Sequence, residues 1–203
     1  MQDPAYLLGM AAVAVCAVTG VLEAGRKPID LFGMVVVALT SALGGGTIRD
    51  LLLDRTVFWV ADQGYLLVAV GMGVATFVLV RAIRLPPGLF LIPDALGLAL
   101  FTVVGVEVSL AAGAPWFVAT FLGVMTAVFG GVLRDILCNE VPLVFTGELY
   151  ATASWVGALL YVALREAGSG PESAGGLAMA LVFGLRVAAI RFNLTLPRFE
   201  SRR

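Results

Sequence analysis

The sequence contains two related motifs, GGGTIRD at residues 44–50 and FGGVLRD at residues 129–135. Each places adjacent glycines just before an Arg-Asp pair, and each lies inside a long apolar segment. The offset between them is 85 residues, and the same offset aligns Ser41-Ala42 with Thr126-Ala127. Gly20-Val21 and Gly105-Val106 are related in the same way. The chain is therefore predicted to contain an internal repeat.

The composition around these stretches points to a membrane protein. Of 203 residues, 60% are hydrophobic and only 13% are charged, whereas soluble domains are about half apolar and about one quarter charged. The net charge of -1 gives no basic stripe for nucleic acid. Histidine is absent, and with it the commonest near-neutral acid–base group. The sequence offers no nucleophile–base pair, metal motif or phosphate loop, so neither an enzyme nor a metal site is predicted.

Seven apolar segments predict an all-α integral membrane protein with seven transmembrane helices. Each segment is about twice the length of a barrel strand, which favours helices. The helices are expected near residues 5–24, 31–53, 64–83, 89–112, 116–138, 147–164 and 177–192, with a Gly/Ser/Pro linker at 168–176.

These helices are expected to form a single transmembrane domain over residues 1–203. It would consist of a three-helix repeat at 5–84, a second at 89–166 and a seventh helix at 174–193. An odd number of spans in each repeat inverts the second copy, so the halves would be related by an axis in the membrane plane.

The distribution of basic residues predicts the orientation. One side of the predicted topology carries Arg26, Lys27, Arg81, Arg84, Arg191, Arg198, Arg202 and Arg203. The other side carries only Arg55 and Arg165. The positive-inside rule then places the C-terminus in the cytoplasm and the N-terminus outside. The basic rim could also hold anionic lipid. Cys16 and Cys138 are read as reduced packing residues.

The glycines are expected to kink or break the second and fifth spans, because each costs about 1 kcal/mol relative to Ala inside a helix. A broken backbone survives in a membrane only against protein or a water-filled cavity. Its freed carbonyls could replace part of a cation's hydration shell. Two such breaks near the midplane would suit a narrow passage. The predicted kink residues are Gly44, Gly45, Gly46, Gly130 and Gly131.

The Arg-Asp pairs place four charges inside the apolar mass: Arg49, Asp50, Arg134 and Asp135. Such charges are costly in a bilayer and should face inward and pair. Neighbouring residues do not face each other on a helix, so the partners are expected on other helices. Besides the other motif's charges, the candidates are Glu23, Asp94 and Glu107. The pairs could fix the repeat interface, set the field felt by an ion, or do both. Arg186 is expected to snorkel to the cytoplasmic side.

Small hydroxyls beside the glycines could line a polar path. They are Thr40, Ser41, Thr47, Thr120 and Thr126, with Thr19 and Thr102 as further candidates. The alternative is that each bonds to its own helix backbone. Phe129, where the first motif has Gly44, could form a hydrophobic constriction or simply pack.

The doubled motif in a seven-span chain resembles the trimeric intracellular cation channel (TRIC) family, especially its short prokaryotic branch. The sequence Asn139-Glu140-Val141-Pro142 after the second motif is similar to that branch as well. The resemblance implies a homotrimer in a prokaryotic plasma membrane. Each protomer would contain its own potassium-permeable pore, lined by the glycine-kinked second and fifth spans. The permeating potassium ion would be the only ligand, with no resident cofactor.

The architecture alone also allows a secondary transporter of a small solute such as glycine, since inverted repeats with broken helices are a known transporter design. The lack of His and of an aromatic cluster near the glycines favours the channel. A purely structural membrane protein fits the doubled intramembrane Arg-Asp pair poorly.

Overall fold

The computed structural model describes residues 4–82, 84–146 and 148–197, and these ranges are almost entirely helical. The elements are α1 (Pro4–Ala24), α2 (Leu31–Leu52), α3 (Phe58–Ala61), α4 (Gln63–Val80), α5 (Leu91–Ala111), α6 (Trp116–Leu137), the 3-10 helix η1 (Leu143–Phe145), α7 (Ala151–Glu166) and α8 (Pro171–Phe192). The all-helical prediction is confirmed.

Six helices in the described ranges are long and apolar enough to cross a membrane: α1, α2, α4, α5, α6 and α8. The predicted sixth span corresponds to α7, which has 16 residues. At 1.5 Å per residue it is about 24 Å long, shorter than the roughly 30 Å hydrocarbon core of a bilayer.

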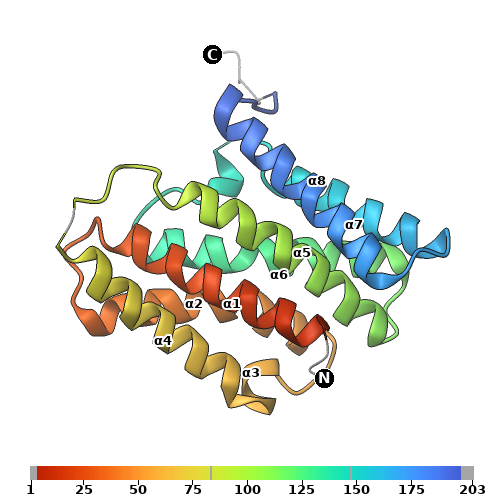
Figure 1. The fold of residues 1–203 in the computed structure, drawn as a ribbon, viewed down its shortest axis with the longest axis horizontal. Helices are drawn as coiled ribbons and strands as arrows, with labels where there is room; N and C mark the ends of the chain where they lie inside the picture. Colours follow the sequence, from red (N-terminus) through yellow and green to blue (C-terminus); the bar gives the residue numbers. More distant parts are fainter. Residues whose placement is uncertain (1–3, 83, 147, 198–203) are drawn as a thin grey trace, which may run out of the picture.

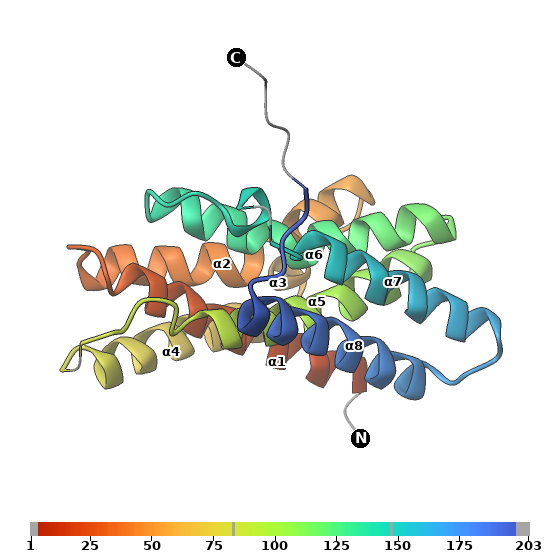
Figure 2. The same ribbon diagram turned by 90° about the horizontal axis from the view of Figure 1, so that it is seen from above.

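Four helices form the centre of the molecule, and the others flank them. Figure 1 shows α1, α2, α5 and α6 in the middle, with α4 on one flank and α7 and α8 on the other. The view from above in Figure 2 again places α4 and α7 at opposite ends. Among the central helices, α2 packs on α6 and α1 packs on α5. Helix α8 packs on α5 and α7, so it covers the side of the molecule formed by the later helices.

Glycines allow the central helices to approach closely, and the contacts recur at the 85-residue offset. A Cβ added at Gly20 would lie 2.8 Å from the Ala38 Cα, and one added at Gly105 would lie 2.8 Å from the Gly123 Cα. A Cβ at Gly45 would overlap the Thr126 carbonyl oxygen of α6. A Cβ at Gly130 would overlap the Ser41 carbonyl oxygen of α2.

The expected helix breaks are therefore absent from the described chain: α2 runs unbroken through Gly44–Gly46, and α6 runs unbroken through Gly130–Gly131. The intrinsic cost of glycine is offset by the close backbone contact between the two helices, as in other membrane proteins with small residues at helix interfaces. A bend of either helix axis at these glycines stays a prediction.

Two helix boundaries differ from those predicted. The chain at 168–176 is not a linker, because α8 begins at Pro171, which has the fixed φ that suits a first helical turn. Gly175 is buried there, and a Cβ on it would lie 3.3 Å from Val103 of α5. Helix α4 ends at Val80, earlier than the predicted boundary at residue 83. Residue 83 lies outside the described residues, and so does residue 147, the predicted start of the sixth span.

Candidate functional site

The two Arg-Asp pairs have the same local geometry. Arg49 Nε donates to Asp50 Oδ1 at 2.9 Å, and Arg134 Nε donates to Asp135 Oδ1 at 2.8 Å. All four side chains are at most 4% exposed. The second oxygen of each carboxylate accepts a backbone N–H eight residues later. Asp50 Oδ2 accepts from Phe58 at 2.9 Å, and Asp135 Oδ2 accepts from Leu143 at 3.0 Å.

The prediction that Arg49 pairs with another helix is therefore wrong, since its partner is the adjacent Asp50. The rule that neighbours do not face each other describes side chains within a helix, but these pairs lie at helix ends. A tight turn follows each pair, with Asp54 at φ 51° and Asn139 at φ 55°, a left-handed conformation that Asp and Asn tolerate well. The returning chain fixes the carboxylate close to the helix end, within reach of the neighbouring guanidinium.

The second pair has an additional partner that the first lacks. Arg134 Nη1 donates to Asp94 Oδ1 at 2.5 Å, which confirms one of the partners considered from sequence. The Phe90 ring lies 4.7 Å from the guanidinium carbon, within cation–π range. In the described chain, Asp50 is the only carboxylate that pairs with Arg49. The other candidates bond elsewhere: Glu23 with Arg26, and Glu107 with Tyr161.

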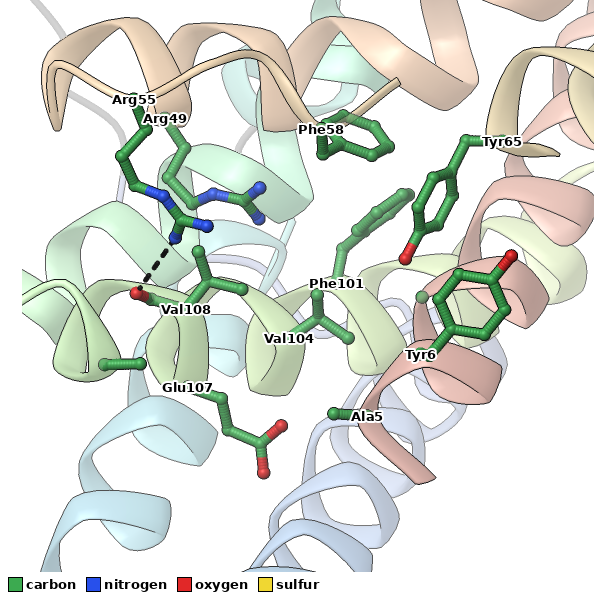
Figure 3. Close-up of a pocket in the computed structure, with 12 residues that line it drawn as sticks. Ala5, Tyr6, Arg49, Arg55, Phe58, Tyr65, Phe101, Val104, Glu107 and Val108 are labelled. Carbon is green, nitrogen blue, oxygen red and sulfur yellow. Dashed lines mark hydrogen bonds between the residues drawn. The ribbon is translucent and has the colours of Figure 1, made fainter. Parts of the chain in front are cut away.

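A cavity of about 340 Å³ opens beside Arg49 (Figure 3). Arg49 and Arg55 lie on one side of it, Tyr6 and Tyr65 lie on the other, and Glu107 lies below. Arg55 Nη1 reaches the Val108 carbonyl oxygen at 3.5 Å. The cavity is thus a mixed polar and aromatic chamber bounded by helices α1 to α5.

Aromatic residues at this cavity were missed by the sequence reasoning. Phe58 and Tyr65 pack edge to face at a centroid distance of 4.9 Å, and Tyr6 packs on Tyr65 at 5.6 Å. The expectation that no aromatic cluster lies near the motifs is wrong. The sequence did hold a signal for Tyr65, because the 85-residue offset aligns it with a second tyrosine, Tyr150. In the structure, Tyr150 is buried beside the second motif.

The small hydroxyls bond mainly to their own helices. Thr40 donates to Val36, Thr47 to Leu43 and Thr126 to Leu122, each at 2.7 Å. Thr19, Thr102 and Thr120 donate to their own helix backbone in the same way. Ser41 lies 3.4 Å from the Thr19 hydroxyl across the α1–α2 contact. Phe129 is half-buried on α6.

Arg186 does not snorkel, because its side chain is fully buried. Its Nη1 and Nη2 each donate to Glu148 Oε2 at 3.1 Å, and Nη1 also donates to the Leu149 carbonyl at 3.0 Å. The guanidinium carbon lies 4.7 Å from the Tyr150 ring centroid. Arg186 thereby attaches α8 to the start of α7. Both cysteines are free and buried, as predicted.

An ion pair in the loops joins the two halves of the sequence. Lys27 Nζ, after α1, lies 2.7 Å from Glu140 Oε1, after α6. Both side chains are solvent-accessible, so the pair contributes little to stability. The hydrogen bond from Lys27 lowers the pKa of the Glu140 carboxyl.

Comparison with known proteins places this arrangement in a family. A family model described as a glycine transporter matches the chain at residues 6–81 and 91–166, two matches displaced by 85 residues. A solved TRIC trimeric intracellular cation channel orthologue from Rhodobacter sphaeroides is 41% identical, with a TM-score of 0.90 over 95% of this chain and 100% of that one. A second solved structure, described as revealing conductance through TRIC cation channels, is 31% identical, with a TM-score of 0.86 over 97% and 98% of the two chains.

Among bacterial relatives, the UPF0126 inner membrane protein YadS of Escherichia coli strain K12 is 42% identical over 96% of this chain and 95% of its own length. A UPF0126 membrane protein of Vibrio cholerae is 41% identical over 96% of this chain and 82% of its own. The chain is a multi-pass helical membrane protein that belongs to the TRIC-type family covered by the glycine-transporter model.

Proposed function

We propose that the protein is a monovalent cation channel, chiefly permeable to potassium, with one pore in each protomer of a homotrimer. The observation that carries the proposal is the cavity beside Arg49, at the end of the glycine-bearing helix α2, with three charged residues in its lining: Arg49, Arg55 and Glu107. The similarity of the whole chain to two solved TRIC cation channels, over nearly their full length, supports the same function. Glu107 contributes negative charge to the chamber, and Asp50 neutralises Arg49. Arg55, which bonds to the Val108 carbonyl, adds a positive charge to the same lining.

The pore is proposed to follow the α2–α6 contact. Thr40, Ser41, Thr47, Thr126 and Phe129 lie on these two helices beside the glycines. The Thr40 and Thr126 hydroxyls donate to carbonyls of their own helices, which leaves their oxygens able to accept from water or to face a cation. The Thr47 oxygen already accepts from Trp59 Nε1 at 2.9 Å. Arg49 and Arg134, each tied to its Asp, would form the charged ends of this path.

We also infer that residues 5–84 and 89–166 form two inverted three-helix repeats, with α8 as a seventh span and α7 as the short sixth. The reciprocal contacts of Gly45 with Thr126 and Gly130 with Ser41 support this arrangement. Two contacting helices exchange equivalent contacts in this way when a two-fold axis relates them. The double family match at the same spacing supports it further.

The proposed location is a bacterial plasma membrane, with the N-terminus outside and the C-terminus in the cytoplasm. The relatives named as inner membrane proteins support the location, and the basic loop residues support the orientation. Anionic lipid is proposed to contact the basic rim. Arg26 and Lys27 are paired with Glu23 and Glu140, so Arg81 and Arg84 would carry most of that contact. No interaction with nucleic acid is proposed.

The second candidate function is a transporter of a small solute such as glycine. The description of the family model and the aromatic residues at the cavity favour it. The cavity volume of about 340 Å³ is also sufficient for such a solute. The similarity to two solved TRIC cation channels favours the channel instead.

Reconstitution separates these two functions. The purified protein is placed in planar bilayers under a potassium gradient. Discrete current steps that reverse near the potassium equilibrium potential are expected of the channel. Absence of steps, together with saturable uptake of glycine into liposomes, would overturn it in favour of the transporter. Protein-free bilayers and liposomes serve as controls.

A further inference from the structure

A second cavity, of about 310 Å³, adjoins the chamber beside Arg49. Both cavities are lined by Ala5, at the start of α1, and by Glu107 of α5, so they meet at these two residues. Helices α1 and α8 lie on either side of the second cavity, and the later part of α5 completes its wall. The cavity thus occupies the space between the first turns of α1 and α8.

The two cavities differ in the sign of their charged residues. The chamber contains Arg49 and Arg55 together with Glu107. Arg55 is exposed and reaches from the loop after α2 to the Val108 carbonyl of α5, so it lies across that side of the chamber. Among the described residues, the charged members of the second lining are Glu107 and Glu172, both acidic. A cation is therefore repelled on the side of Arg55 and attracted on the side of Glu172.

The boundary between the cavities suits the passage of a cation. Ala5 contributes no more than a methyl group to it. Glu107 is positioned there by Tyr161 of α7, whose hydroxyl donates to Glu107 Oε1 at 2.8 Å. Figure 3 shows the Glu107 carboxylate directed away from the arginines and towards Ala5. Acidic side chains in such positions select cations in many channels.

Glu172 lies at the outer opening of the second cavity. It is exposed in the first turn of α8, where the helix dipole favours a negative charge. Pro4 and Pro171, at the starts of α1 and α8, line the same opening. Both helix starts lie on the outer side of the membrane in the proposed topology, so the opening would face the outside.

We propose that the second cavity is a lateral entrance for cations, through which potassium ions pass Glu172 and then Glu107 to reach the chamber beside Arg49. The proposal rests on the proposed channel function and adds to it a route of entry and a role for α8. Two acidic side chains along the route raise the local concentration of cations. The lateral entrance therefore limits the potassium current when salt does not screen these charges.

Charge reversal at Glu172 tests the route in planar bilayers. At an ionic strength of about 0.15 M, exposed charges act over about 8 Å, and Glu172→Lys is expected to lower the single-channel conductance at least twofold. At about 1 M salt this range falls to about 3 Å, and the difference should disappear. Glu166→Lys is the matched control, because Glu166 is an exposed acid at the end of α7 that does not line the cavity. It should conduct like the parent at both salt concentrations.

Thiol reagents of opposite charge probe the lateral entrance without relying on current. With Cys16 and Cys138 replaced by Ala, Met179→Cys places the sole thiol of the chain in the lining, at a half-buried position. Relative to their rates with free 2-mercaptoethanol, a cationic methanethiosulfonate should modify it at least fivefold faster than an anionic one. Glu172→Gln should lower this preference at least twofold, whereas Glu166→Gln should not. Elution at the parent volume in size-exclusion chromatography establishes that each variant is folded.

The two readouts separate this proposal from the channel proposal. If the parent conducts potassium but Glu172→Lys conducts like Glu166→Lys, or the reagent preference does not depend on Glu172, cations do not enter by this route and the channel stands. If the preference depends on Glu172 while the parent does not conduct potassium, the cavity does attract cations, and it is the channel proposal that fails.

Discussion

Gly45 and Gly130 make the closest helix contacts at the centre of the molecule. Each would place a Cβ into a backbone carbonyl of the facing helix, and a backbone can yield only if the helices separate. Gly45→Ala is therefore expected to destabilise the fold by about 1–3 kcal/mol, the range for overpacked cores. Thermal unfolding in detergent measures the change.

Gly184→Ala on α8 provides the matched control, because nothing lies within 4 Å of the added methyl group. It should leave stability unchanged or raise it by up to about 1 kcal/mol, since Ala is the better helix former. If both variants had equal stability, the close contact at Gly45 would not be what offsets the cost of glycine in these helices.

The unequal partners of the two arginines lead to a second prediction. Asp50→Ala leaves Arg49 buried without a carboxylate, whereas Asp135→Ala leaves Arg134 still bonded to Asp94. Removing one member of a buried pair costs about 3–5 kcal/mol, so Asp50→Ala should approach that loss and Asp135→Ala should stay well below it. Chemical denaturation of both variants, with Glu166→Ala as control, measures the difference. Equal losses would mean that Asp94 does not stabilise Arg134.

At the level of elements, the apolar segments predicted the helices within a few residues, because length and hydropathy suffice where lipid surrounds the chain. The start of α8 was missed, since Ser173–Gly176 looks like a linker when its contacts with α5 are unknown. The burial of Arg186 was missed for the same reason. Its partner Glu148 belongs to a loop, and hydropathy does not indicate where a loop folds back.

The candidate site was only partly predictable. The offset identified the Arg-Asp pairs, and the cost of intramembrane charge placed Asp94 among several candidate partners without selecting it. The cavity could not be predicted, because it depends on the absence of a side chain at Gly9 and on rings from four helices.

Arg186 allows the attachment of α8 to be tested. Arg186→Met keeps the apolar part of the side chain but leaves Glu148 and the Leu149 carbonyl unpaired, so a loss of about 3 kcal/mol is expected. Protease cleavage of the segment around Glu148 and Leu149, before α7, should become faster. Arg191→Met, on the exposed face of the same helix, should not change the cleavage rate; if it had the same effect, a general loss of charge would be responsible.

At the scale of the whole molecule, the Lys27–Glu140 pair connects loops that are far apart in sequence. Because the pKa of Glu140 is lowered in the folded protein, the pair contributes stability above the ordinary Glu pKa of about 4.3 and loses it as pH falls through the lowered value. The melting temperature of the parent should exceed that of Glu140→Gln at neutral pH, and the difference should vanish in stronger acid. A difference that persisted there would have a cause other than this ion pair.

The second carboxylate at Arg134 also gives the molecule an electrical polarity. One end of the proposed path holds a guanidinium with two carboxylates, and the other holds a guanidinium with one, beside Arg55. A cation that enters from the two sides therefore meets different local fields. In symmetric potassium solutions the current should rectify, with unequal amplitudes at equal positive and negative voltages, and Asp94→Asn should make the current–voltage curve more nearly linear.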